Sequence, residues 1–231
     1  MTPARGGASP DGLLTAQQHA VDALRALIVG GALRPGMRAN QEDLAARFGL
    51  SVAPVREALR VLEQEGQLTY RPRRGYFVTE LRIADLEEIY DLRRLLEARA
   101  AREGLAALDD EGLARVQAAA RACMDAVDAG DVAAELAANR AFHFGIFDPH
   151  RPHTLRVIQS LWDATEAYRA MYYNSPEERR ASIEAHDRIL EALQARDADR
   201  LIAELDAHRD RALVVLREVL VEAEDGGRRA E

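Results

Sequence analysis

The sequence predicts a mostly α-helical fold, with a small N-terminal unit of three helices and a β-hairpin followed by a larger, all-α helical bundle. Three observations predict this. Apolar residues recur at helical spacing along most of the chain, and β-prone runs occur only near residues 68–79. From residue 84 onward the segments are rich in Ala, Leu, Glu and Arg, which are good helix formers. A chain of 231 residues that is 48% hydrophobic can bury two cores.

The first unit is expected at residues 15–79, after a flexible tail at residues 1–14 that is rich in Gly, Ala and Pro. Residues that favour the N-cap position precede its three apolar-periodic segments. They are Thr15, Asn40 and Ser51. Gly49 separates the second segment from the third and suits a left-handed helix end. The pattern predicts three short helices with a tight turn before the third, which is a helix-turn-helix.

The third helix has two distinct faces. Val55, Leu59 and Leu62 share an apolar face. Arg56 and Arg60 lie one turn apart on another face. Arginine suits DNA reading because its planar fork can bond guanine O6 and N7 or grip a phosphate. The alternative interpretation is an ordinary solvated arginine face on a small helical subdomain.

A β-hairpin is predicted directly after the third helix. Its β-prone runs, residues 68–70 and 76–79, flank a Pro/Gly turn, so the unit is a winged helix-turn-helix. Gly75 at the tip of this wing allows close approach to a narrow minor groove, with Arg73 and Arg74 beside it. Helix and wing together indicate a DNA-binding domain.

This unit resembles the winged helix of GntR-family transcription regulators. The matching segments, at matching spacing, are Leu33-Arg34-Pro35-Gly36, Leu44-Ala45, Pro54-Val55-Arg56-Glu57-Ala58-Leu59, Leu62-Glu63, Glu65-Gly66 and Arg74-Gly75. The positions that the resemblance places on DNA are Gln41, Ser51, Arg56, Arg74 and Gly75. The family usually has an arginine directly after the serine, where this chain has Val52.

An all-helical second domain is expected at residues 85–224, between a linker at residues 80–84 and a tail at residues 225–231. Its helical segments are separated by Asp-, Gly- and Pro-containing breaks. The expected helices are 85–107, 110–129, 131–147, 153–173, 177–195 and 198–224. Ala- and Leu-rich segments of this length predict a helical bundle.

Charge is distributed unevenly between the two parts. Residues 1–82 hold 11 arginines against 8 acidic residues, a net charge of +3, whereas residues 83–231 hold 20 against 31, a net charge of −11. This asymmetry predicts that only the first unit meets phosphate. The single cysteine, Cys123, excludes an intrachain disulfide. Because the sequence has no signal-peptide pattern and no membrane-spanning run, we expect a cytoplasmic protein without a membrane partner.

Histidines in the second domain are spaced so that they could converge. Asn139 and His143 are four residues apart and therefore share one helical face. His186 and His208 lie 22 residues apart on the last two expected helices, which a short turn joins. An amide oxygen and three imidazoles from three helices would make an open metal site. The alternative is a set of exposed or hydrogen-bonded structural histidines.

The second domain resembles the helical effector-binding (FCD-type) domain of the FadR subfamily, in its six-helix, VanR-like form. The matching segments are Tyr90-Asp91-Leu92-Arg93 with Glu97, Asn139-Arg140-Ala141-Phe142-His143, and His186-Asp187-Arg188-Ile189-Leu190, with His208 at the right interval. The resemblance implies a divalent metal, zinc or nickel, held by Asn139, His143, His186 and His208. It also implies that Arg93 points into the pocket, where it would pair with an anionic ligand.

The function expected from these features is that of a ligand-responsive transcription regulator, a repressor rather than an enzyme. A homodimer would place two winged helices on a palindromic double-stranded DNA operator. A small organic acid bound at the metal would favour one arrangement of the helical domain. Two alternatives remain: the same regulator without a metal, and a metalloenzyme with a helical active site. The sequence has no H-E-x-x-H motif, which disfavours the enzyme.

Overall fold

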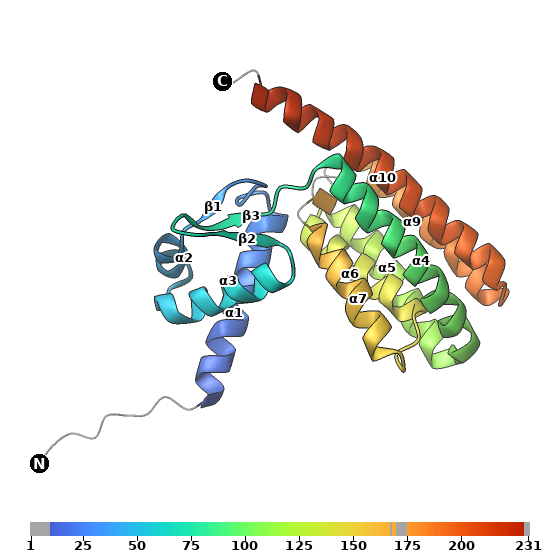
Figure 1. Ribbon diagram of the computed structural model, residues 1–231. Coiled ribbons are helices and arrows are strands. Elements are labelled where there is room, and N and C mark those ends of the chain that lie inside the picture. Colours follow the sequence, from blue (N-terminus) through green and yellow to red (C-terminus); the bar gives the residue numbers. More distant parts are fainter. Residues whose placement is uncertain (1–9, 167, 170–174, 229–231) are drawn as a thin grey trace, which may run out of the picture. The chain divides into compact units, whose positions relative to one another are not determined.

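The protein is described by a computed structural model that covers residues 10–166, 168–169 and 175–228. The mostly α-helical fold is confirmed (Figure 1). The chain divides into two compact units, residues 1–80 and 81–231, and each is described by itself. Among the described residues, none of the helices combines the length and the apolar character needed to cross a membrane.

The first unit contains three helices and a small antiparallel sheet with strand order β1-β3-β2. Its elements are α1 (Pro10–Val29), β1 (Arg38–Ala39), α2 (Gln41–Phe48), α3 (Val52–Gln64), β2 (Leu68–Arg71) and β3 (Gly75–Val78). Helix α1 begins at Pro10 rather than at Thr15, so residues 10–14 are helical where a flexible tail was expected. A proline is accommodated at a helix start because the first turn needs no N–H donor.

Residues at the helix ends form the turn before α3. The Asn40 side chain accepts a hydrogen bond from the backbone N–H of Glu42 and caps α2. Gly49 ends that helix in the left-handed conformation at φ +66°, as expected. Ser51 holds the N-cap position of α3 with extended backbone, but its side chain makes no capping hydrogen bond. Behind the turn, Leu24 of α1 and Leu59 of α3 are fully buried in the core.

The second unit is a helical bundle (Figure 1). Its helices are α4 (Ile83–Ala107), α5 (Asp110–Ala129), α6 (Val132–Ile146), α7 (Pro152–Ala164), α9 (Pro176–Gln194) and α10 (Ala198–Arg228). The core contains Phe142, Ile158, Trp162, Ile189 and Leu201, contributed by α6, α7, α9 and α10. Helix α10 continues to Arg228, so residues 225–228 are helical where a tail was expected.

The expected single helix at 153–173 is wrong, because α7 ends at Ala164. The Thr165 hydroxyl donates to the carbonyl oxygens of Trp162 at 3.1 Å and Leu161 at 3.4 Å. Such back-bonding offers the backbone an alternative to the helical ladder and bends or ends helices. Helical residues resume at Glu166; position 167 and residues 170–173 of the expected helix lie outside the described residues.

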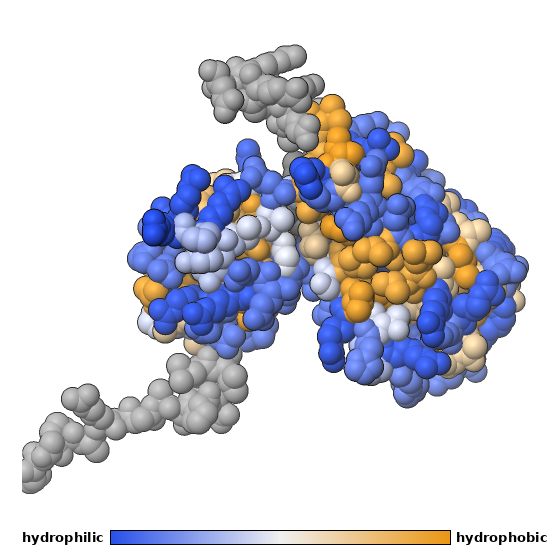
Figure 2. All heavy atoms as spheres, viewed as in Figure 1, coloured by the Kyte–Doolittle hydropathy of each residue, from blue (hydrophilic) through white to orange (hydrophobic). Residues whose placement is uncertain are grey.

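One face of the helical unit carries an apolar patch (Figure 2). Large apolar side chains on this unit remain exposed: Leu95 and Leu92 of α4 are 70% and 42% exposed, and Val214 of α10 is 56% exposed. A patch of exposed apolar side chains is typical of a surface that contacts another protein.

Candidate DNA-binding surface and candidate metal centre

Helix α3 separates its apolar and arginine faces as expected. Val55 and Leu59 are completely buried. The side chains of Arg56 and Arg60 are 52% and 56% exposed. Both contact Glu57, at 3.9 Å and 3.1 Å. Because exposed ion pairs of this kind contribute little, the two guanidinium groups can exchange Glu57 for a phosphate or a base edge.

A hollow of about 610 Å³ lies between the start of α2, the exposed face of α3 and the tip of the β2–β3 hairpin. It brings together six of the seven residues expected on DNA. They are Gln41, Arg56, Arg60, Arg73, Arg74 and Gly75. Ser51 is exposed but is not among the lining residues. Arg38 also lines the hollow, and the sequence pattern missed it because the two-residue strand β1 is too short to show a period.

The wing tip depends on left-handed backbone. Gly75 has φ +91° and Arg73 has φ +63°. At the hairpin, the guanidinium of Arg71 lies 4.5 Å, and that of Arg74 5.7 Å, from the centre of the Phe77 ring. The Phe77 ring therefore makes cation–π contacts with both guanidinium groups. The wing tip therefore places positive charge beside α3.

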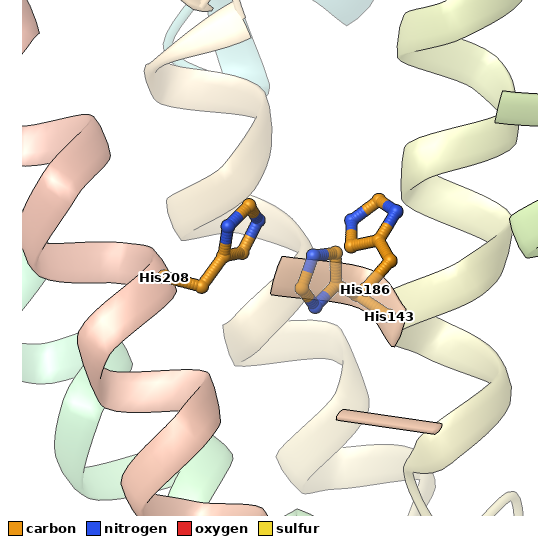
Figure 3. A group of neighbouring side chains, drawn as sticks. All are labelled: His143, His186 and His208. Carbon is orange, nitrogen blue, oxygen red and sulfur yellow. The ribbon is translucent and has the colours of Figure 1, made fainter. Parts of the chain in front are cut away.

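Three histidines from separate helices converge inside the helical unit (Figure 3). His143 comes from α6, His186 from α9 and His208 from α10. One ring nitrogen of each lies within 4.8 Å of the others. Ring centres are 5.2 Å apart for His143 and His208, and 5.4 Å apart for His143 and His186. His143 and His186 are only 4% and 2% exposed.

Several polar atoms of this cluster lack hydrogen-bond partners among the described residues. They are Oδ1 of Asn139, Nδ1 of His143, Nδ1 and Nε2 of His186, and Nδ1 of His208. Buried polar atoms are normally paired, and each unpaired one costs about 1–3 kcal/mol. Each neutral imidazole has one acceptor nitrogen, so this group of buried, unpaired polar atoms fits a metal-binding site.

The histidines are held in the neutral form that binds metal. Burial, reinforced by neighbouring positive charge, lowers the pKa of His208 to about 3. Burial likewise lowers the pKa of His143 and of His186 well below the ordinary value. All three rings are therefore uncharged at neutral pH. Their nitrogens can donate electron pairs without first losing a proton.

The donor set fits a divalent ion such as zinc or nickel. Nitrogen donors bind zinc at about 2.0–2.1 Å in tetrahedral geometry, so two donors on one ion are roughly 3.4 Å apart. The histidine nitrogens lie within 4.8 Å of one another, so the most distant pair would need to close by about 1.4 Å on binding. Asn139 lines the pocket beside His143 and His208 and offers its orphaned oxygen as a further donor.

A small cavity of about 30 Å³ adjoins the metal-ligand candidates, and Arg93 lines it as expected. Its wall is centred on Glu97, a buried carboxylate. Glu97 accepts hydrogen bonds from Arg93 Nε at 2.8 Å, Trp162 Nε1 at 2.7 Å and Arg209 Nη2 at 2.7 Å. Burial by itself would raise the pKa of Glu97, but Arg93 and Arg209 outweigh it and hold that pKa at about 2.

Two further arginines of the cavity, Arg169 and Arg209, were not expected from the sequence. Arg209 directly follows His208, and that adjacency was the available signal. Arg169 follows the break at Thr165, which changes the direction in which later side chains project. No periodicity in the sequence indicates that break.

The fold and these two sites define a two-domain transcription regulator that reads DNA with a winged helix-turn-helix. The family model described as "Bacterial regulatory proteins, gntR family" matches residues 16–78, and the FCD domain model matches residues 88–211. The chain belongs to the gntR family of bacterial DNA-binding transcription regulators and carries an FCD domain. Members of this family regulate transcription and are not enzymes.

Curated relatives and solved structures agree with this assignment. The HTH-type transcriptional regulator McbR of Escherichia coli (strain K12) is 32% identical over 73% of this chain and 78% of its own length. The HTH-type transcriptional regulator YdhC of Bacillus subtilis (strain 168) is 28% identical over 87% and 91%. The HTH-type transcriptional repressor GlaR of Escherichia coli (strain K12) is 28% identical over 75% and 83%. The structure of E. coli McbR/YncC superposes with a TM-score of 0.76, at 28% identity, over 88% of this chain and 97% of that chain.

Proposed function

We propose that the protein is a repressor whose helical unit binds a divalent metal and, through it, a small organic acid that modulates operator binding. The observation that carries the proposal is the convergence of three imidazoles, two of them buried and that of His208 partly buried, each with at least one ring nitrogen that lacks a partner among the described residues. A repressor among the relatives supports the direction of regulation. Because its operator is bacterial DNA, the protein acts in the cytoplasm.

DNA binding in this proposal is by a homodimer on a palindromic operator. Two-fold protein symmetry places two copies of α3 and two wings on two half-sites. Arg56 and Arg60 read the major groove, and Arg73, Arg74 and Gly75 approach the minor groove. Gln41 and Ser51 complete the proposed contacts to DNA. The exposed apolar side chains of α4 and α10 support association of two chains.

His143, His186, His208 and Asn139 would hold the metal. When bound, the ion supplies a positive centre that attracts a carboxylate. The neutral amide of Asn139 leaves that charge uncompensated, which favours an anionic ligand. Arg93 adds a second positive group beside it, already oriented by Glu97 at 2.8 Å. The effector changes repression only if it prefers one arrangement of the helical unit over another.

Elemental analysis of full-length protein, purified without a chelator or a nickel column, tests the metal. About one divalent ion per chain is expected in the wild type. We expect His143→Ala and His208→Ala to lower occupancy severalfold at equal total metal. The matched control is His153→Ala, because His153 of α7 is exposed and outside the cluster. Full occupancy in either cluster variant would contradict the ligand set, and a metal-free wild type would favour a regulator that needs no metal.

Footprinting on DNA upstream of the protein's own gene tests the operator. A protected palindrome with two half-sites about one helical turn apart, or a multiple of that, is expected at moderate salt. Sedimentation of the free protein checks that the binding species is a dimer. The proposed dimer would be wrong if a monomer protects a single half-site with full affinity.

A further inference from the structure

Three buried arginines surround the cavity next to the metal-ligand candidates, but they are not equally paired. Arg93 and Arg209 both donate to Glu97, at 2.8 Å and 2.7 Å. Arg209 also pairs with Asp206. The charge of Glu97 is therefore committed to these two arginines. The third arginine, Arg169, is not among the donors to Glu97 in the part of the chain that the structure describes.

Arg169 is the arginine best placed to receive an anion. It is 5% exposed, and its Nη2 has no hydrogen-bond partner among the described residues. Its Nη1 reaches Glu166 only at 3.5 Å, and Glu166 also lies 3.9 Å from Arg140. A buried guanidinium with an unpaired donor is costly, and a bidentate carboxylate would remove that cost.

Trp162 holds the Arg169 guanidinium in place. The guanidinium carbon of Arg169 lies 4.1 Å from the centre of the Trp162 ring, and that of Arg93 lies 4.4 Å from it. The ring in turn is 5.2 Å from His143, centre to centre. An anion bound to Arg169 would thus lie in the same cavity as the proposed metal ligands, beside the only tryptophan of the chain.

The residue before Arg169 reaches the start of the helical unit. The hydroxyl of Tyr168 accepts a hydrogen bond of 2.7 Å from the backbone N–H of Leu81. Leu81 is the first residue of the second unit and follows the last residue of the DNA-binding unit. Tyr168 is 3% exposed, and the bond itself is part-buried. One short segment therefore contacts both the cavity and the connection to the DNA-binding unit.

The cavity is too small for an organic acid unless its wall moves. Its volume is about 30 Å³, whereas an engineered cavity that binds benzene has a volume of roughly 150 Å³. Packed interiors respond to such an insertion by a discrete shift of a wall element. A ligand that binds Arg169 pulls on the segment that also carries Tyr168.

We propose that Arg169 binds the carboxylate of the effector and that Tyr168 passes the resulting displacement to the linker at Leu81. This inference rests on the proposed function, because it takes a carboxylate as the ligand. Arg169 is the anion-binding residue. Tyr168 touches no ligand and acts as a positioning residue.

The anion-binding step is tested with metal-loaded, full-length protein and two probes, acetate and malonate. Binding is followed by Trp162 fluorescence and by calorimetry, and metal content is measured in every variant. We expect Arg169→Gln to weaken binding of the tighter probe at least tenfold with unchanged metal content, and Arg169→Lys to restore part of the loss. The matched control, Arg156→Gln on the exposed side of α7, should stay within twofold of the wild type.

The two ways in which this test can fail are distinct. If the wild type binds a probe and Arg169→Gln binds it equally well, the assignment of Arg169 is overturned and the proposed function stands. If neither probe binds the metal-loaded wild type, the carboxylate effector is wrong and the inference about Arg169 falls with it.

The coupling step is tested with Tyr168→Phe, which keeps the ring and removes only the hydroxyl. We expect probe binding within twofold of the wild type, while the ratio of operator affinities with and without the probe falls to near one. A purely structural role would leave that ratio unchanged. An unchanged ratio in Tyr168→Phe, or a ratio of one in the wild type, would overturn the coupling.

Discussion

The two units place their functional arginines in opposite environments. In the DNA-binding unit, Arg56 and Arg60 are more than half exposed, and both contact Glu57. In the helical unit, Arg93, Arg169 and Arg209 are at most 6% exposed, and Arg93 and Arg209 share a single deeply buried carboxylate, that of Glu97. Water satisfies the first set whether or not DNA is bound, whereas the second set depends on partners inside the protein.

This difference indicates that the two units respond to different ligands and conditions. A surface of solvated charges can bind and release a polyanion without changing its own fold. A buried cluster with unpaired donors and acceptors stores an unfavourable free energy that a ligand can relieve, so its stability depends on what is bound. We therefore expect metal, pH and effector to act on the helical unit, and salt to act on the DNA-binding unit.

The largest expected effect is the pH dependence of the metal-free helical unit. The pKa values of His143, His186 and His208 are lowered in the folded state, to about 3 for His208. Below the ordinary pKa of about 6.5 the unfolded chain gains protons that the folded chain cannot accept, so stability falls as pH falls. Each histidine contributes a slope of up to about 1.4 kcal/mol per pH unit.

Urea unfolding followed by Trp162 fluorescence measures this slope, because the only tryptophan lies in α7 of the helical unit. His208→Gln should have a shallower pH dependence than the wild type between pH 6.5 and pH 4.5. An identical slope in the variant would mean that the ring of His208 is not protected from protonation.

Metal should stabilise only the helical unit. An ion present at 100 times its dissociation constant adds about 2.7 kcal/mol to the free energy of unfolding. We expect this gain in the Trp162 transition when zinc is added and its loss when a chelator follows. His143→Ala serves as the control, since it should unfold at the same urea concentration with and without zinc. A gain that persists in this variant would place the metal elsewhere.

Arg56→Ala should affect the DNA-binding unit alone. If Arg56 reads a base, operator binding weakens by about 1–3 kcal/mol at fixed salt. The Trp162 unfolding transition should not change. Fluorescence anisotropy with labelled operator DNA gives the affinity, and Arg115→Ala on the exposed face of α5 is the matched loss of charge. If both substitutions weakened operator binding equally, Arg56 would contribute only its positive charge and would not read a base.

The smallest effect concerns the backbone of the wing. Gly75 has φ +91°, a backbone conformation that residues with a side chain rarely adopt. A Cβ added there would lie 3.7 Å from Arg38, so it would meet no steric clash. Gly75→Ala should therefore destabilise the first unit by about 1 kcal/mol through strain. Hydrogen exchange of α3 amides measures it, with Ser51→Ala as a control because the Ser51 side chain makes no capping bond. Protection equal to the wild type would contradict a strained tip.

The sequence was most informative where neighbouring residues decide the structure. The Asn40 cap, the left-handed Gly49 and the two faces of α3 depend on contacts within a few residues, and all three are present. The pairing of Asn139 with His143 on one helix face follows from a four-residue spacing in the same way. Helix spacing does not say which faces of different helices meet, so the approach of His186 and His208 was only an expectation.

The break at Thr165 marks the limit of such reasoning. Periodicity carries one amphipathic helix across residues 153–173, but the hydroxyl of Thr165 bonds back to the turn before it and α7 ends. Arg169 and Tyr168 follow that break. A back-bonded threonine inside a helical pattern leaves no trace in hydrophobic spacing, so Arg169 was not selected from the sequence.

The sequence by itself determined most of the helices, the winged helix-turn-helix and the candidate groups for binding DNA or metal, because these depend on local spacing and side-chain chemistry. Only the tertiary structure decided which of those groups are buried together without partners. Burial and pairing depend on how α4, α6, α7, α9 and α10 pack, and this packing leaves polar atoms of three histidines and one arginine without partners among the described residues.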